Sequence, residues 1–143
     1  MEKRTEYCKG LIPVGAYETN LSFGEEKGLE IELFNADNHI VFDFGWVFSF
    51  RILEEGYVQS EVYSDAEINK YKNDKFSNII YRLEGGEYAS YIKKIADGYL
   101  DDIELFHFVI ITQNYNIDIV SCSTPKCLVN GNKVDGEQWL EGE

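Results

Sequence analysis

Five side chains in the sequence could bind a soft metal ion: Cys8, His39, His107, Cys122 and Cys127. Cys122 and Cys127 lie in the stretch CSTPKC, and the four residues between them are a gap that zinc ligands use. A structural zinc site needs two further ligands, and no second pair has such a spacing. His107 lies in an alternating strand pattern that favours a buried, hydrogen-bonded histidine, and His39 lies at the mouth of an expected hairpin. We therefore expect no metal site and no cofactor.

Motifs for catalysis are equally weak. Residues 43–45 spell Asp-Phe-Gly, the magnesium-binding tripeptide of protein kinases, but the sequence lacks the glycine-rich loop and the catalytic loop that it requires. Adjacent carboxylates occur at 25–26, 54–55 and 101–102, and a chain with 26 acidic residues produces such pairs by chance. No G-x-S-x-G elbow is present. The sequence leaves enzymatic activity open and favours its absence, with no catalytic residue assigned.

The charge of the chain restricts its partners. The 13 basic and 26 acidic residues give a formal net charge of -13. Binding to nucleic acid or to an anionic membrane requires a basic surface, so neither is expected. A basic protein is the partner that this charge permits, because complementary fields speed the encounter. The simpler interpretation is that the carboxylates only keep the protein soluble.

Two acidic segments that contain a tyrosine are the candidate contacts with a basic partner. The first is DGYLDDIE, between the best predicted helix and a predicted hairpin, in which Tyr99 could anchor among the charges. Its candidate residues are Asp97, Tyr99, Asp101, Asp102 and Glu104. The second is smaller and contains Glu54, Glu55 and Tyr57.

The stretch IVFDFGWVFSF, residues 40–50, contains five aromatic rings. Even-numbered positions from Ile40 to Ile52 are all large and apolar, whereas the odd positions are small, polar or β-branched. This alternation predicts a long strand whose whole even-numbered face lies in the core. Gly45 is the expected place for a bulge or bend, since an unbroken strand of this length would exceed the size of the domain. The alternative is that these aromatic rings line a ligand pocket.

Period-two alternation predicts further strands around this stretch. Residues 17–23 and 29–33 alternate, and the turn Asn35–Asn38 leads into the aromatic stretch as in a hairpin. Residues 57–63 and 78–83 are further candidate strands. Residues 104–112 and 117–122 form a second hairpin, which we expect to be central in the sheet because it is more uniformly apolar. Asn130-Gly131 predicts a tight turn.

Two segments have helical spacing. A capping-box spacing between Ser64 and Glu67 predicts a short surface helix. The segment EYASYIKKIADG is stronger, because Tyr88, Tyr91, Ile92 and Ile95 form an i, i+3, i+4, i+7 stripe before Gly98, a natural C-terminal cap. The expected fold class is α+β: a mainly antiparallel, twisted sheet, a meander of about six to eight strands, with one or two helices packed on one face.

Length and cysteine content indicate the number of domains and the cellular compartment. A chain of 143 residues is most simply one domain, residues 1–143, with an acidic and loosely ordered tail at residues 134–143. Three cysteines argue against a disulfide framework and favour a reducing cytoplasm. No apolar run reaches the ~20 residues of a membrane span. The sequence gives no indication of oligomeric state.

Two functions of different classes are compatible with these patterns. The first is a small acidic cytoplasmic interaction protein without catalytic activity, such as an inhibitor or immunity protein that covers a basic toxin nuclease. The alternative is a domain that binds a small ligand, or a minor enzyme, with an aromatic-lined pocket. The high net negative charge favours the first.

Overall fold

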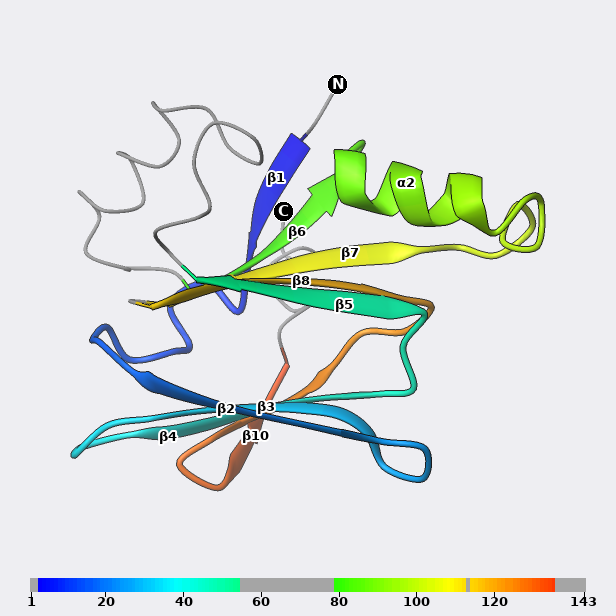
Figure 1. Ribbon diagram of the computed structural model, residues 1–143. Coiled ribbons are helices and arrows are strands. Elements are labelled where there is room, and N and C mark those ends of the chain that lie inside the picture. Colours follow the sequence, from blue (N-terminus) through cyan, green and yellow to red (C-terminus); the bar gives the residue numbers. More distant parts are fainter. Residues whose placement is uncertain (1–2, 55–78, 113, 136–143) are drawn as a thin grey trace.

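Two antiparallel sheets pack face to face in this protein, and a helix at residues 87–95 lies outside them (Figure 1). The computed structural model describes residues 3–54, 79–112 and 114–135. Within these residues each sheet has five strands. We name them sheet A, with the strand order β1-β6-β7-β8-β5, and sheet B, with the order β10-β9-β4-β3-β2.

The strands of sheet A are β1 (Lys3–Tyr7), β5 (Ser49–Glu54), β6 (Ile80–Glu84), β7 (Phe106–Ile111) and β8 (Tyr115–Ser121). The strands of sheet B are β2 (Glu18–Gly24), β3 (Gly28–Phe34), β4 (His39–Gly45), β9 (Lys126–Val129) and β10 (Asn132–Val134). Hairpins join β2 to β3, β3 to β4, β7 to β8 and β9 to β10. The chain passes from sheet A to sheet B between β1 and β2, enters sheet A again between β4 and β5, and returns to sheet B between β8 and β9.

The main core lies between the two sheets. Sheet B contributes alternate residues such as Ile31 and Phe42, and sheet A contributes Phe108 and Ile119; all four side chains are fully buried. Tyr7 packs edge-on against Phe108, with 5.0 Å between the ring centroids. Burial of these side chains is the main driving force for the packing of the two sheets.

Helix α2 (Glu87–Ile95) lies on the outer face of sheet A (Figure 1). Tyr88 and Ile92 point toward the sheet and pack with Leu100 and Val120 in a second, smaller cluster. Asp97 and Gly98 both have positive φ, so the helical conformation ends there.

The α+β class and the mainly antiparallel pairing agree with the sequence prediction, whereas the number of sheets and the packing of the helix do not. We expected one meandering sheet covered by helices. A helix of nine residues is too short to cover a five-stranded sheet. The inward face of sheet A is covered by sheet B instead, and α2 covers part of its outer face.

Several local predictions are confirmed. The 17–23 and 29–33 segments form β2 and β3, and the predicted hairpin turn at residues 35–38 leads into β4. The hairpin of β7 and β8 is central in its sheet. Asn130 and Gly131, both at positive φ, form the tight turn between β9 and β10. The candidate strand at residues 57–63 and the capping-box helix at residues 64–72 lie outside the described residues, as does the tail beyond residue 135.

The aromatic stretch does not form one strand. A register shift opposite Leu29 and the positive φ of Gly45 end β4 at the predicted bend, so that Ile40, Phe42 and Phe44 are buried in the core. The prediction that the whole even-numbered face is core is wrong at Trp46 and Ile52, whereas Phe50 packs against the main core and Phe48 against the cluster under α2. Trp46 is 59% exposed. It lies in the connection between the sheets, where strand alternation no longer determines which side chains are inside.

Gly28 allows the chain to leave sheet B at Gly45, because the backbone of Gly28 packs directly on that of Gly45. A Cβ placed on Gly28 would lie 2.1 Å from the Gly45 carbonyl carbon, and Gly28 also has a φ of +74°. We predict that Gly28→Ala lowers the free energy of unfolding by about 3 kcal/mol, because both the positive φ and the backbone contact disfavour a side chain. Chemical denaturation measures this loss.

Gly24 provides a matched control, since it is the direct strand partner of Gly28 and has neither constraint. Gly24→Ala should change the free energy of unfolding by about 0.5 kcal/mol or less. Equal losses for the two variants would show that the contact between Gly28 and Gly45 is not a special constraint.

Candidate functional site

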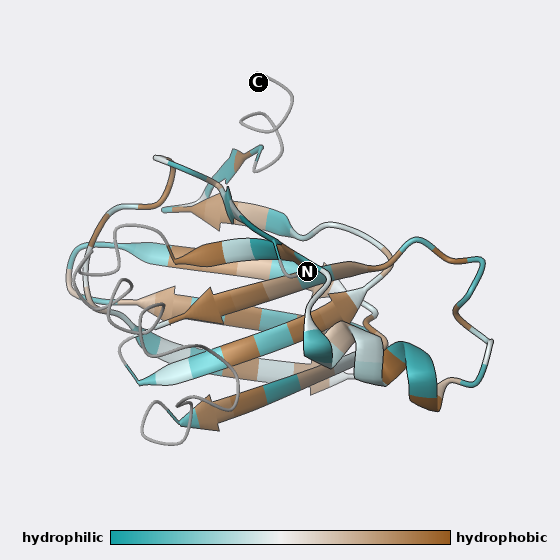
Figure 2. Cartoon of the chain, turned by 90° about the horizontal axis from the view of Figure 1, so that it is seen from above, coloured by the Kyte–Doolittle hydropathy of each residue, from teal (hydrophilic) through white to brown (hydrophobic). Residues whose placement is uncertain are grey.

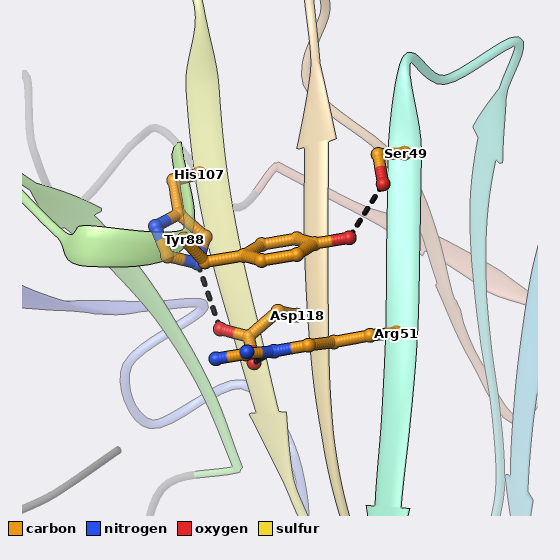
Figure 3. Close-up of polar contacts among 5 residues, drawn as sticks. All are labelled: Ser49, Arg51, Tyr88, His107 and Asp118. Atoms are coloured by element: carbon orange, nitrogen blue, oxygen red, sulfur yellow. Dashed lines mark hydrogen bonds and ion pairs between the residues drawn. The ribbon is translucent and has the colours of Figure 1, made fainter. Parts of the chain in front are cut away.

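A buried carboxylate, that of Asp118, lies at the centre of the outer face of sheet A. Asp118 is only 2% exposed and lies on β8, between β5 and β7. One of its oxygens accepts a hydrogen bond from Arg51 Nε at 2.9 Å, and the other lies 2.8 Å from His107 Nε2 (Figure 3). Strand pairing places Arg51 directly opposite Asp118. The charge of Asp118 is thereby compensated from both neighbouring strands.

His107 is buried, as its position in an alternating strand predicted, but only one of its ring nitrogens has a partner. Nε2 contacts Asp118, whereas Nδ1 has no hydrogen-bond partner among the described residues. A Cβ placed on Gly86 would lie 2.9 Å from Nδ1, so the backbone just before α2 packs closely over the ring. This packing leaves no room for a substrate at Nδ1.

Tyr88 connects α2 to this polar cluster. Its hydroxyl lies 2.5 Å from Ser49 Oγ, and its ring lies over the Arg51 guanidinium, 4.4 Å from Cζ to the ring centroid. Its ring also contacts the ring of His107 (Figure 3). We name Ser49, Arg51, Tyr88, His107 and Asp118 the polar clamp. The clamp joins β5, β7 and β8 to α2.

The contacts of the polar clamp hold the helix on sheet A. An aspartate paired with a histidine can serve as a catalytic dyad when the free ring nitrogen faces a reacting group. Here His107 and Asp118 are 4% and 2% exposed, and Gly86 closes the free side of the ring. The clamp therefore fixes the position and orientation of α2 on sheet A.

Helix α2 and the loop that follows it expose several large apolar side chains. Tyr91 and Ile95 belong to the predicted helical stripe, but they are 57% and 59% exposed, unlike Tyr88 and Ile92. Tyr99, in the loop, is 77% exposed. Figure 2, viewed from the side of α2, shows hydrophobic and hydrophilic residues interspersed along this loop.

The first acidic segment of the sequence prediction lies in the same loop. Its acidic side chains are all exposed: Asp97, Asp101, Asp102 and Glu104. Residues 97–104 contain no basic residue. We name Tyr91, Ile95 and Tyr99 together with these four acids the α2 face.

Of the second predicted cluster the structure describes Glu54 alone. Glu54 is exposed at the end of β5, paired with Tyr115, whereas the loop at 97–104 lies at the opposite end of sheet A, where β7 begins (Figure 1). Glu55 and Tyr57 lie outside the described residues. Glu54 is therefore not part of the surface formed by residues 97–104.

Two shallow hollows at the far end of sheet B share Phe34, Asn35 and Ala36, with volumes of about 450 and 510 Å³. Their polar groups mostly bond to one another. Glu32 contacts His39 Nε2 and accepts a hydrogen bond from Asn20 Nδ2. These two contacts lower the pKa of the Glu32 carboxyl. No aromatic residue of the stretch 42–50 lines either hollow. Tyr17 and Phe34 are the aromatic residues in their lining, so the hollows add no support to a ligand pocket formed by the 42–50 stretch.

The gap between Cys122 and Cys127, although one that zinc ligands use, does not bring the two side chains into one site. Cys122 is exposed and Cys127 is buried, and Cys127 lies beside Cys8 instead. Among the described residues no group of three or more histidine, cysteine or acidic side chains could hold a metal ion. Across the same residues, no helix has the length and apolar character needed to cross a membrane.

Sequence reasoning missed the polar clamp. The available signal was Asp118, the single charged residue inside the apolar strand β8. A carboxylate at the centre of a sheet requires a cationic or hydrogen-bonding partner. Arg51 and His107 were candidates, because strand alternation allows both side chains to lie on the same face of the sheet as Asp118. The partners themselves depend on the strand order, which only the fold reveals.

Removal of the Asp118 charge should destabilise the protein. Asp118→Asn leaves Arg51 and His107 facing a neutral amide, and we expect the free energy of unfolding to fall by about 2 kcal/mol. Glu30→Gln, at an exposed position of β3, removes the same charge and should cost about 0.5 kcal/mol or less. Urea denaturation of both variants measures the difference, and similar stabilities would contradict a clamping role for Asp118.

Tyr88 should give the clamp an alkaline limit. Burial raises the pKa of Tyr88 above 10.0, against the opposing hydrogen bond with Ser49. Because the unfolded chain then releases this proton first, the stability that Tyr88 contributes is complete below pH 10 and is lost as the pH rises further. Tyr88→Phe should be less stable by about 1 kcal/mol at pH 8, and this deficit should shrink above pH 10.

Denaturation curves at pH 8 and above pH 10 test this prediction. Tyr91→Phe, at an exposed position of the same helix, should remain within about 0.5 kcal/mol of the wild type at pH 8. A Tyr88→Phe deficit that stays constant or grows with pH would contradict the assignment.

Comparison with known proteins gives no family for this chain. No protein-family model matches it, and neither a curated protein nor a solved structure matches it. Function must therefore be inferred from the residues and the geometry described above.

Proposed function

We propose that the protein is a small acidic interaction protein without catalytic activity, which binds a basic protein partner through the α2 face. The supporting observation is the combination of exposed apolar side chains with uncompensated acids. Tyr91, Ile95 and Tyr99 are each more than half exposed, and the adjoining loop carries four acids. Exposed aromatic and aliphatic anchors surrounded by charge are typical of protein interfaces.

Charge complementarity determines the class of partner. Between residues 87 and 104 the chain has five acidic residues and two lysines, Lys93 and Lys94, and the loop at 97–104 is entirely acidic in its charges. Such a surface attracts a basic protein and repels nucleic acid or an anionic membrane. An inhibitor or immunity protein that covers a basic toxin nuclease is one concrete form of this function.

The outer face of sheet B is a weaker candidate for the same role. Its charges are mixed, because the strand register places Glu30 beside Asp43 and Asp43 beside Lys126. Leu128 is an exposed large apolar residue on this face, at 37%, whereas Phe23 of β2, 54% exposed, shares the strand parity of the inward-facing residues. Neighbouring opposite charges with little exposed apolar area are typical of a solvated face.

The polar clamp supports the proposal by making α2 a rigid platform. Tyr88 and Ile92 are fixed against sheet A, so Tyr91 and Ile95 on the same helix are held in a defined position. Phe48 packs against the same cluster, and Trp46 contacts Phe48 edge-on at 4.7 Å. A preorganised surface loses less conformational entropy when a partner binds.

The first test is purification of the tagged protein from its native host at low ionic strength, together with the products of neighbouring genes. We expect a basic protein to co-purify and its affinity to fall at least tenfold between about 50 and 300 mM salt. Absence of any partner, or binding that ignores ionic strength, would refute the proposal.

Charge reversal locates the contact. Asp101→Lys combined with Asp102→Lys should weaken binding of the purified partner at least tenfold, measured by calorimetry at low salt. Glu18→Lys combined with Asp37→Lys, at exposed positions of β2 and of the turn between β3 and β4, changes the net charge equally and should weaken binding less than threefold. Equal losses for the two double variants would show that only the net charge matters.

The aromatic anchor is tested separately. Tyr99→Ala should weaken partner binding about tenfold or more while leaving the melting temperature unchanged, because Tyr99 is 77% exposed and its side chain stabilises little of the fold. Unchanged affinity would exclude the loop as the centre of the interface.

A further inference from the structure

Two buried thiols from opposite sheets lie in contact in the core. Cys8 follows β1 of sheet A directly, and Cys127 lies on β9 of sheet B. Their Sγ atoms are 3.6 Å apart, with the Cys8 thiol donating to the Cys127 sulfur, and the residues are 0% and 1% exposed. The sequence places these cysteines 119 positions apart, and the fold brings them together.

The backbone conformation of Cys8 is a second unusual feature at this contact. Cys8 has a φ of 55°, in the left-handed region that glycine or asparagine adopts at lower cost. Its carbonyl accepts a hydrogen bond from Leu11 N at 3.0 Å, which fixes the turn after β1. A cysteine at this position is conformationally unfavourable, and its side chain is directed at the second buried sulfur of the core.

We infer that Cys8 and Cys127 form a reversible disulfide that links the two sheets when the protein meets a low-molecular-weight disulfide such as oxidised glutathione. Sulfur atoms in a disulfide are about 2.05 Å apart, so the two side chains must approach by roughly 1.5 Å. Rotation of the two side chains can supply a displacement of this size. The third cysteine, Cys122, is exposed and takes no part in the link.

The exchange balances without a further reactant. One thiolate attacks oxidised glutathione, breaking its sulfur–sulfur bond and releasing one glutathione thiol. The second thiolate attacks the mixed disulfide, forming the Cys8–Cys127 bond and releasing the second glutathione thiol. Each cysteine loses its proton, and two electrons pass from the protein to glutathione. In a reducing compartment the pair stays as thiols.

Burial affects the rate of this reaction in the folded protein. The hydrogen bond between the thiols, together with desolvation, raises the pKa of Cys8 well above its usual range. Since the thiolate is the reactive form, exchange in the folded state is slow. The test therefore supplies the oxidant during refolding, when both thiols are accessible.

The experiment refolds the full chain from urea in a glutathione buffer rich in the oxidised form. Titratable thiols should fall from three to one per chain in a monomeric product, with Cys122 as the remaining thiol by peptide mapping. The melting temperature should rise by roughly 10 °C relative to the reduced protein, because the link closes most of the chain into one loop.

Variants make the test decisive. Cys122→Ser keeps the pair and should show the same rise, while Cys127→Ser should show no rise and no intramolecular disulfide. If Cys127→Ser does not fold, Cys122→Ser alone tests the inference, since its two remaining cysteines must pair with each other. Persistence of two free thiols in Cys122→Ser, a disulfide that includes Cys122 in the wild type, or a lower melting temperature for the oxidised form would overturn the inference.

Discussion

The arrangement of sheet A and α2 depends on the contacts of the buried Asp118 carboxylate with Arg51 and His107. A buried carboxylate is stable only when hydrogen-bond donors or cations surround it, so Arg51 on β5 and His107 on β7 must lie on either side of β8. Arg51 in turn lies against the ring of Tyr88, which holds the helix on the sheet. One electrostatic requirement thus connects three strands and a helix, and its consequence at the surface is the fixed position of Tyr91 and Ile95.

A second constraint, in the backbone, separates the two sheets. The contact between Gly28 and Gly45 lets β4 end where it does, so the chain can leave sheet B and continue as β5 in sheet A. Phe42 and Phe50 consequently contribute to the same core from opposite layers. Between them Trp46 is exposed on the connection. The aromatic stretch is therefore mostly core, and its one strongly exposed ring lies where the chain changes sheets.

Local patterns predicted many of the individual elements, because alternation and helical spacing are properties of neighbouring residues. The segments of β3, β4, β7 and β8 and helix α2 follow from periodicity, and the turn at Asn130 follows from the Asn-Gly pair. Strand β1 was not predicted. Assignment of strands to two sheets could not be predicted, since that depends on contacts between residues far apart in sequence. For the same reason the sequence identified the acids of residues 97–104 but neither the clamp around Asp118 nor the contact of Cys8 with Cys127. The sequence also did not predict that Tyr91 and Ile95 are exposed. Helical spacing shows which residues share a face of the helix, but not how many of them are buried.

The proposed function depends on one spatial claim, that a basic protein covers the α2 face. Hydrogen–deuterium exchange of the protein, free and bound to its co-purified partner, tests this claim most directly because it locates the contact without substitutions. Slower exchange on binding should be concentrated in residues 87–104, with the turn at residues 35–38 unchanged. Protection centred on sheet B, with residues 87–104 unchanged, would contradict the account.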